Sequence, residues 1–472
     1  MTAQAEDTRV ILRGGTIVSA EGEARADILI EDGRVLALDV DLSDAAGRVI
    51  DVGGCQLLPG LVDSHTHLEM PTMGTVTADD FDTGTAAAAA GGTTSIVDFA
   101  MQTDGSVLAG IDTWMDNARN KAHIDYGFHV AITDASPLAI EEMEQAVARG
   151  VSSFKVFMAF KGSFMADDQQ LLRVLRRTGE VGGLVQVHAE NGDAIDLNID
   201  DALSRGDISP YSHATTRPDT TEQEATARAI HLASWAKRPI FVVHVSSARA
   251  VHEIQSARSR GLPVFGETCV HYLTLTEEEL ARPDFDGAKF VCSPPLRHEH
   301  DQDVLWSALR QQSLQIVTTD HCPFNFCGQK ELGREDFSKI PNGLPTIEHR
   351  LPLLHQHGVR TGRMTMSELV ATTSTSPARM FGLTSKGRIA PGFDADIVVF
   401  DPEATLEISA KSHHMAVDYT PFESWTCTGA PIQVLSRGTT VFADGEVLST
   451  PGRGRYIHRS TGPFPAGEIT RL

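Results

Sequence analysis

The two ends of the chain alternate apolar and polar residues with the period of two that is typical of half-buried strands. The clearest case is Asp27-Ile-Leu-Ile-Glu-Asp-Gly-Arg-Val-Leu-Ala-Leu, where Asp32-Gly33 supplies the left-handed residues of a hairpin turn. The same alternation returns in residues 395–400 and 440–448, with Asp444-Gly445 as the turn. Neither end has enough strands for a stable sheet of its own, so we expect both to pair into one small β-sandwich domain.

Between them, short and continuously apolar runs alternate with amphipathic segments of helical length. The apolar runs are residues 95–99, 154–158, 184–188, 240–244 and 314–320, and residues 168–178 and 221–236 have helical patterns. Strands that alternate with helices over about 330 residues predict an α/β fold, a TIM-like (β/α)8 barrel with long loops. We therefore expect the barrel in residues 59–385 and the β-sandwich in residues 1–58 and 386–472.

Composition restricts the partners of this 472-residue chain. Its 40 Lys+Arg and 63 Asp+Glu give a net charge of −23, which repels phosphate backbones and anionic lipids. We expect no nucleic-acid partner, and a small neutral or weakly charged substrate. The first residues lack a signal peptide, and the uncharged stretch 83–97 is too short and too weakly apolar for a membrane span. Six scattered cysteines without a CxxC pair predict reduced thiols in a cytoplasmic protein.

Several predicted strands end in residues that bind metal ions, at the edge where barrel enzymes carry their active sites. His65 and His67 stand two positions apart, so both imidazoles project to one side of a strand. His188 and His244 close two further strands, and Asp320 closes another. Taken singly, a strand-end histidine or an aspartate that caps a helix needs no metal. Together they predict a metal centre in which Asp320 is both ligand and proton acceptor.

Lys155 lies inside the apolar strand Phe154-Lys-Val-Phe-Met, where an uncompensated ammonium is costly. A salt bridge is the ordinary form of compensation. The alternative is that CO₂ adds to the neutral amine and makes an N6-carboxylated lysine, an anion able to bridge two cations. An ammonium would repel both ions, so the number of histidines favours the carboxylated form.

Seven motifs follow one another along the chain. They are Pro59-Gly-Leu-Val-Asp-Ser-His65-Thr-His67-Leu-Glu-Met, Phe154-Lys155-Val-Phe-Met-Ala, Val187-His188-Ala-Glu-Asn-Gly-Asp, Val243-His244-Val-Ser, Cys292-Ser293-Pro-Pro-Leu-Arg, Thr319-Asp320-His-Cys-Pro-Phe and Ile340-Pro-Asn342-Gly. In this order, with the closing Gly387-Arg-Ile-Ala-Pro-Gly-Phe-Asp-Ala-Asp, they resemble the dihydropyrimidinase and D-hydantoinase branch of the cyclic amidohydrolases. The resemblance covers nearly the whole chain.

The resemblance implies a binuclear zinc hydrolase that opens dihydropyrimidine or hydantoin rings to N-carbamoyl amino acids. It implies two Zn²⁺ per chain, with other divalent metals possible, and a homo-oligomer, a tetramer or a dimer. Its ligand set puts His65, His67 and Asp320 on one ion, puts His188 and His244 on the other, and uses carboxylated Lys155 as the bridge.

The resemblance also assigns the substrate contacts. The backbone of Ser293 and of Asn342 would hold the amide and ureide atoms of the ring. Met70 and Phe157 would lie near the ring substituent. Without a substrate, the first two are turn residues beside Pro294 and Gly343, and the other two are core residues.

One position departs from the family pattern. The usual Lys-Val-Phe-Met-Ala-Tyr reads Lys155-Val-Phe-Met-Ala-Phe160 here, so the phenol that would hydrogen-bond the developing oxyanion is missing. Losing one such donor typically costs about 10²–10³ in kcat. Another group replaces it, or the substrate differs, or the activity is low.

Three other functions are weaker fits. An allantoinase or another cyclic amide hydrolase of the superfamily is disfavoured because the Phe-Met-Ala and His-Ala-Glu-Asn-Gly-Asp contexts look closer to the hydantoinase branch. A non-catalytic paralogue like the collapsin response mediator proteins would have lost ligands, whereas all six ligand positions are filled here. A serine hydrolase would need a Gly-x-Ser-x-Gly elbow, which the chain lacks.

Overall fold

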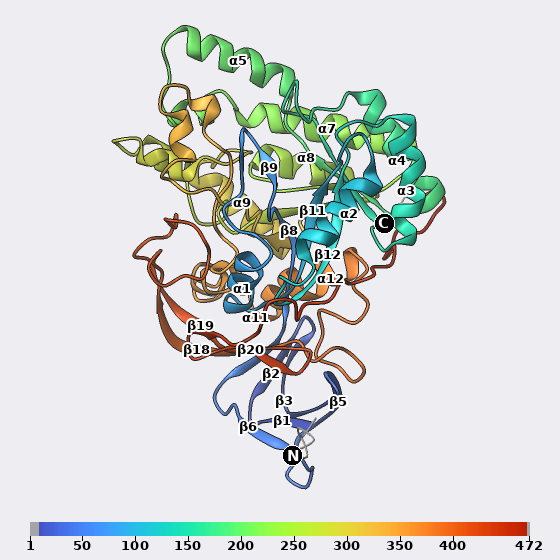
Figure 1. The fold of residues 1–472 in the computed structure, drawn as a ribbon, viewed down its shortest axis with the longest axis vertical. Helices are drawn as coiled ribbons and strands as arrows, with labels where there is room; N and C mark the ends of the chain where they lie inside the picture. Colours follow the sequence, from blue (N-terminus) through green and yellow to red (C-terminus); the bar gives the residue numbers. More distant parts are fainter. Residues whose placement is uncertain (1–8, 470–472) are drawn as a thin grey trace.

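An eight-stranded parallel sheet forms the centre of the protein in the computed structural model, which describes residues 9–469 (Figure 1). Its order is β17-β16-β15-β14-β13-β12-β11-β8, and a parallel bridge between Thr66 and His321 joins the two edges into a nearly closed barrel. The strands are β8 (Leu61–Thr66), β11 (Thr93–Met101), β12 (Asp125–Ala131), β13 (Ser153–Phe157), β14 (Leu184–His188), β15 (Ile240–Val242), β16 (Val264–Cys269) and β17 (Ile316–Thr318). The predicted barrel is confirmed.

The barrel strands are apolar because helices and loops cover them on the outside. A fully buried arginine, the first residue of α10 (Arg350–Leu354), contacts two of these strands. Arg350 donates to the carbonyls of Val62 at 3.2 Å and Val317 at 3.1 Å, and it lies 3.6 Å from Asp63. The Asp63 carboxylate also accepts from the hydroxyl of Thr319 at 2.7 Å. This network fixes the end of β17 just before Asp320.

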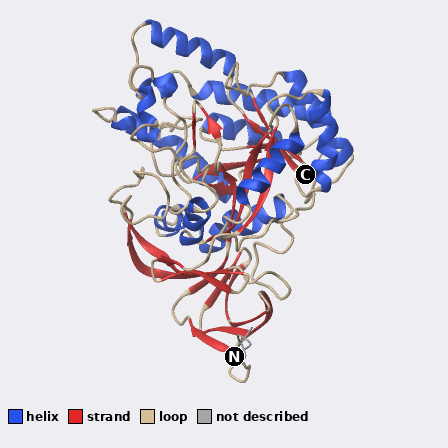
Figure 2. Cartoon of the chain, viewed as in Figure 1, coloured by secondary structure: helices blue, strands red, loops and turns tan. Residues whose placement is uncertain are grey.

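Helices surround the barrel (Figure 2). The helices predicted at 168–178 and 221–236 are α4 and α7. Helix α4 begins as predicted, at a capping box of Asp167 and Gln170, and continues to Val181. Helix α7 begins two residues earlier than predicted, at Asp219, with an acidic first turn. No helix within residues 9–469 is long and apolar enough to cross a membrane. The α-helices are α1 (Thr83–Ala90), α2 (Val107–Ala118), α3 (Pro137–Ala148), α4 (Asp168–Val181), α5 (Gly192–Ser204), α6 (Tyr211–Thr215), α7 (Asp219–Ala236), α8 (Ala248–Ser259), α9 (Glu299–Arg310), α10 (Arg350–Leu354), α11 (Met366–Val370) and α12 (Ser376–Met380).

Short helical turns fill the long loops between these elements. The 3-10 turns are η1 (Glu277–Ala281), η2 (Asp286–Phe290), η3 (Lys330–Gly333) and η4 (Phe337–Lys339), and the π-helical turns are η5 (His355–Val359) and η6 (Ala371–Thr375). A small hairpin, β9 (Pro71–Thr72) and β10 (Thr75–Val76), follows β8. These loops bring side chains to the carboxyl ends of the strands.

Strands from the N-terminal and C-terminal parts of the chain pair as predicted, in the lower part of the molecule in Figure 1. In a seven-stranded sheet of order β21-β20-β19-β18-β7-β2-β3, β18 pairs antiparallel with β7 from the other end of the chain. A second sheet of order β5-β4-β1-β6 uses the N-terminal part alone. The strands are β1 (Arg9–Arg13), β2 (Thr16–Ser19), β3 (Gly22–Arg25), β4 (Asp27–Glu31), β5 (Arg34–Asp39), β6 (Arg48–Asp51), β7 (Gln56–Pro59), β18 (Ile397–Glu407), β19 (Thr426–Ser436), β20 (Thr439–Ala443) and β21 (Glu446–Val447).

Both predicted hairpin turns are present. Asp32 and Gly33 join β4 to β5 with φ of 50° and 79°, and Asp444 and Gly445 join β20 to β21 with φ of 54° and 79°. Left-handed φ at both central residues matches the twist of the flanking strands. The domain boundaries at 58/59 and 385/386 stay predictions.

Candidate active site

A cavity of about 360 Å³ opens at the carboxyl ends of the barrel strands. Every predicted site residue except His65 lines it, and His65 is fully buried behind the wall. The predicted residues in the lining are His67, Met70, Lys155, Phe157, Phe160, His188, His244, Ser293, Asp320 and Asn342. Barrel topology has thus collected in one cavity residues that lie up to 275 positions apart, from 342 − 67.

His65, His67 and Asp320 form one cluster of possible metal ligands, with their ligand atoms all within 4.8 Å of one another. The Nε2 atoms of His65 and His67 lie 3.2 Å and 3.3 Å from Asp320 Oδ1. Asp320 reaches this point because its backbone turns into the left-handed region just after β17, at φ 44°. A left-handed non-glycine residue is strained, and such strain is often held at functional sites.

His188, His244 and Lys155 lie beside this cluster. His188 Nδ1 is 2.9 Å from His244 Nε2, and Lys155 Nζ is 2.9 Å from His65 Nε2. The rings of His65 and His244 are 5.4 Å apart, which places the two histidine pairs in contact. His244 also has a left-handed backbone, at φ 39°.

Burial sets the charge of these groups. It lowers the pKa of all four histidines, which favours the neutral imidazole that binds metals. Burial also lowers the pKa of Lys155, and Asp320 and Glu267 only partly oppose it. The pKa of Asp320 is held well below its ordinary value, because His65 and a hydrogen bond from His67 outweigh the burial that would raise it.

A carboxyl group lies behind one histidine of each pair. Glu190 accepts from His188 Nε2 at 2.7 Å, so the lone pair on His188 Nδ1 is directed toward His244. Glu267 contacts Nδ1 of His65 and leaves Nε2 facing Lys155 and Asp320. Metal-binding histidines typically have such partners. The site thus offers neutral imidazole nitrogens and one carboxylate close together. This set of donor atoms fits zinc-class divalent ions.

The pKa values of the two carboxyl groups are shifted in opposite directions. Burial raises the pKa of Glu267 well above its ordinary value. Burial acts on Glu190 in the same direction, but Arg217, at 2.9 Å, and His188 hold the pKa of Glu190 far below its ordinary value. Glu190 is therefore a buried anion paired with a buried cation.

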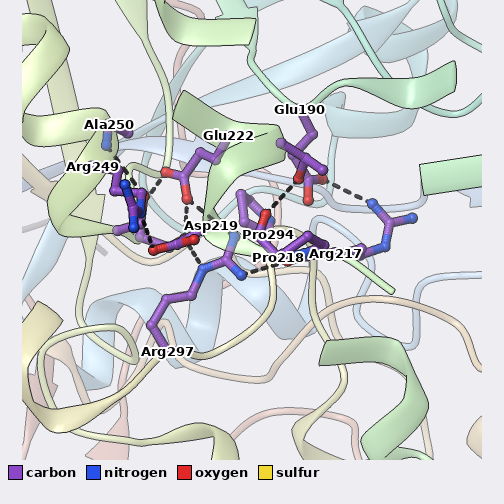
Figure 3. A network of polar contacts seen from close by, with 12 residues as sticks. Glu190, Arg217, Pro218, Asp219, Glu222, Arg249, Ala250, Pro294 and Arg297 are labelled. Atoms are coloured by element: carbon purple, nitrogen blue, oxygen red, sulfur yellow. Dashed lines mark hydrogen bonds and ion pairs between the residues drawn. The ribbon is translucent and has the colours of Figure 1, made fainter. Parts of the chain in front are cut away.

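The ion pair of Glu190 continues into a buried network that ties three loops together (Figure 3). Arg297 donates to the carbonyl of Arg217 at 2.6 Å and to Glu222 at 3.2 Å. Glu222 in turn accepts from the backbone N–H and the hydroxyl of Ser246, at 2.9 Å and 2.6 Å. Because Ser246 follows His244 by two residues and Arg297 follows Ser293 by four, the network holds both histidines in register with the Ser293 loop.

Ser293 and Asn342 present backbone polar groups to the cavity. Within residues 9–469 their N–H and C=O groups have no hydrogen-bond partner. Unpartnered groups in a half-buried wall are costly unless something binds them. The lining also has apolar side chains, among them those of Met70, Phe157 and Phe164.

Phe160 lies in the wall beside the histidines. Its ring is 4.9 Å from that of His188, and the guanidinium of Arg217 lies 5.6 Å from its centroid. Its backbone is left-handed, at φ 68°. This side chain brings no hydroxyl to the cavity, and a buried arginine contacts the ring.

Sequence reasoning missed the residues that support the site. Glu267 had a readable signal, since it is a charged residue inside the apolar strand β16. Glu190 stood in a quoted motif without a role. Arg217, Glu222 and Arg297 gave no signal, because their partners lie 24 to 80 positions away.

Known proteins resemble this chain along nearly its full length. Residues 56–441 match the model of the Amidohydrolase family. The chain is 51% identical to a D-hydantoinase of Streptomyces coelicolor, covering 96% of this chain and 98% of that protein. It is 42% identical to a dihydropyrimidinase of Rattus norvegicus, covering 98% of this chain and 90% of that protein. The crystal structure of a dihydropyrimidinase from Brevibacillus agri is similar, with a TM-score of 0.95 and 52% identity over 96% of this chain and 99% of that one.

Proposed function

Because the chain belongs to the D-hydantoinase and dihydropyrimidinase group of the amidohydrolase family, we propose that it hydrolyses cyclic amides. Its substrates are hydantoins, dihydropyrimidines or both, and its products are N-carbamoyl amino acids. One observation carries this proposal: a single cavity is lined both by His67 and Asp320 of the His–His–Asp cluster and by Ser293 and Asn342, whose backbone groups are unpartnered among the described residues.

We propose two zinc-class ions per chain. His65, His67 and Asp320 would hold one, His188 and His244 the other, with Lys155 between them as the carbamate. When bound, such ions lower the pKa of a water molecule and polarise the scissile carbonyl. The lowered pKa of Lys155 supports the carbamate, because only the neutral amine adds CO₂. In that reaction an N–C bond forms and the amine releases one proton.

Asp320 is the proposed proton carrier. Its low pKa keeps it ionised, so it can accept a proton from the attacking water as the new C–O bond forms. It then gives this proton to the ring nitrogen as the C–N bond breaks. Protonation is needed because an amide nitrogen is otherwise a poor leaving group.

The backbone of Ser293 and of Asn342 is proposed to hold the ring. Their N–H groups can donate to its carbonyl oxygens, and their C=O groups can accept from its N–H groups. Met70 and Phe157 then lie on the side of the substituent, with Phe160 next to His188. An apolar wall suits an alkyl or aromatic substituent better than the polar ureido group of allantoin.

We further propose that the chain is a cytoplasmic homo-oligomer, a tetramer or a dimer. All six cysteines are free, which suits a reducing compartment. The homo-oligomer is proposed from the family resemblance alone.

A turnover panel tests the proposed reaction. Protein of measured metal content is given dihydrouracil, hydantoin, 5-substituted hydantoins and allantoin, and the N-carbamoyl product is quantified. Ring opening of the first three classes, with apolar 5-substituents preferred, is expected. Protein that holds two metal ions and opens none of these rings would contradict the proposal.

A further inference from the structure

Lys330, at the start of η3, is buried and has no carboxylate partner among residues 9–469. Its side chain is fully buried, and its Nζ donates to three backbone carbonyls. The acceptors are the oxygens of Val291 at 2.9 Å, Pro341 at 2.6 Å and Gly343 at 2.9 Å. An ammonium has three N–H donors, so these carbonyls satisfy it completely.

The three carbonyls flank the two backbone segments of the substrate wall. Val291 lies two residues before Ser293, and Pro341 and Gly343 lie on either side of Asn342. The segments also touch directly, since the N–H of Gly343 donates to the carbonyl of Val291 at 3.0 Å. The ammonium therefore connects the two segments just behind the groups that face the cavity.

This arrangement is costly for the fold. Burial lowers the pKa of Lys330 to about 7, and no carboxylate offsets it. Lys386 shows the usual solution, because its buried ammonium contacts three carboxylates, those of Asp125, Asp394 and Asp396. An apolar side chain would fill the place of Lys330 without a desolvation cost. Such an apolar side chain could not hydrogen-bond the three carbonyls, so it could not fix their spacing.

We propose that Lys330 is a positioning residue for substrate binding, which holds the Ser293 and Asn342 segments at the spacing at which their backbone groups receive the ring. The inference rests on the proposed function, since it assumes that these groups bind the cyclic amide. Lys330 lies outside the cavity lining and acts through the two segments.

The test is Lys330→Met, which keeps an unbranched side chain only one atom shorter and removes its donors. KM for hydantoin and dihydrouracil should rise about tenfold, the effect of one misplaced hydrogen bond, while kcat changes less. The dissociation constant of the N-carbamoyl product, measured by calorimetry, should rise with it. Metal content should stay at the wild-type value. Lys330→Gln keeps two N–H donors on a shorter side chain, so its KM should lie between those of the wild type and Lys330→Met.

Arg238→Met is the matched control. Arg238 is also buried and donates to backbone carbonyls, those of Gly183, Pro465 and Gly467, away from the cavity. The Arg238→Met substitution should lower the melting temperature and leave KM unchanged. An unchanged KM and product affinity in Lys330→Met, or an equal rise in Arg238→Met, would overturn the inference. So would failure of both Lys330 variants to fold, because the lysine would then serve folding alone. If the wild type itself opens no ring, the proposed function fails instead.

Discussion

Glu190→Gln is the sharpest test of how the protein supports its second histidine pair. The carboxylate of Glu190 is fully buried, 2.7 Å from His188 Nε2 and 2.9 Å from the guanidinium of Arg217. Glutamine keeps the shape and one acceptor oxygen but removes the charge. Arg217 then becomes a buried cation without a counterion, because Glu190 is the only carboxylate that pairs with it among the described residues.

Two magnitudes follow from this geometry. Breaking a buried ion pair costs about 3–5 kcal/mol, and we expect the lower end because the amide oxygen still accepts from Arg217. Loss of a charged partner behind a ligand histidine typically costs about 10–100-fold in metal affinity, because the imidazole becomes less basic and less well oriented. We therefore expect one of the two proposed metal ions to dissociate during dialysis that leaves the wild type fully loaded.

The ion pair of Glu190 should also make the stability of the protein depend on pH. The pKa of folded Glu190 lies below its ordinary value of 4.5, so its stabilisation is complete above about pH 4.5. It is lost as the pH falls through the folded pKa. Denaturant unfolding should therefore show less loss of stability below pH 4.5 in the variant than in the wild type.

Glu224→Gln is the matched control, since Glu224 pairs with Arg228 at 2.9 Å on the surface. It should cost under about 0.5 kcal/mol and leave metal content unchanged. The assays are equilibrium unfolding and metal analysis after dialysis. Two retained ions and wild-type stability in Glu190→Gln would refute the role assigned to the carboxylate.

Three other substitutions test the centre directly. Asp320→Asn should lower kcat by about 10²–10⁴ while the fold survives, and near-normal turnover would assign proton transfer to another group. Lys155→Ala should lose at least one metal ion and nearly all activity, with partial rescue by short carboxylic acids; a variant that keeps both ions would make the lysine structural. Phe160→Tyr should raise kcat little, because the Phe160 ring already packs against His188 in a wall without a hydroxyl. A tenfold rise in kcat at constant KM would show that nothing in the wild type replaces the missing phenol.

Local features of the fold could be predicted from the sequence. Asp32-Gly33 and Asp444-Gly445 specify their turns because left-handed φ is cheap for these residues. The strand ends that carry His188 and His244 were visible because a polar residue closes an apolar run. The barrel then brings such ends together, so the candidate residues could be grouped before their distances were known.

Contacts between distant segments could not be predicted from the sequence. Lys330 stands in Gly-Gln-Lys-Glu-Leu-Gly, a polar context typical of an exposed turn, yet it is fully buried. Glu222 and Arg297 are 75 positions apart, and nothing local relates them. Such groups find their partners only when loops of different strands meet above the barrel. Sequence patterns therefore indicated the groups in the cavity but not most of those that support them.

A metal titration of the metal-free protein tests the central claim most directly. Zn²⁺ is added in steps with bicarbonate present, and the rate of hydantoin or dihydrouracil opening is followed against metal bound per chain. The account predicts a rate that reaches its plateau at two ions per chain and disappears on chelation. A full rate at zero or one ion per chain would contradict it.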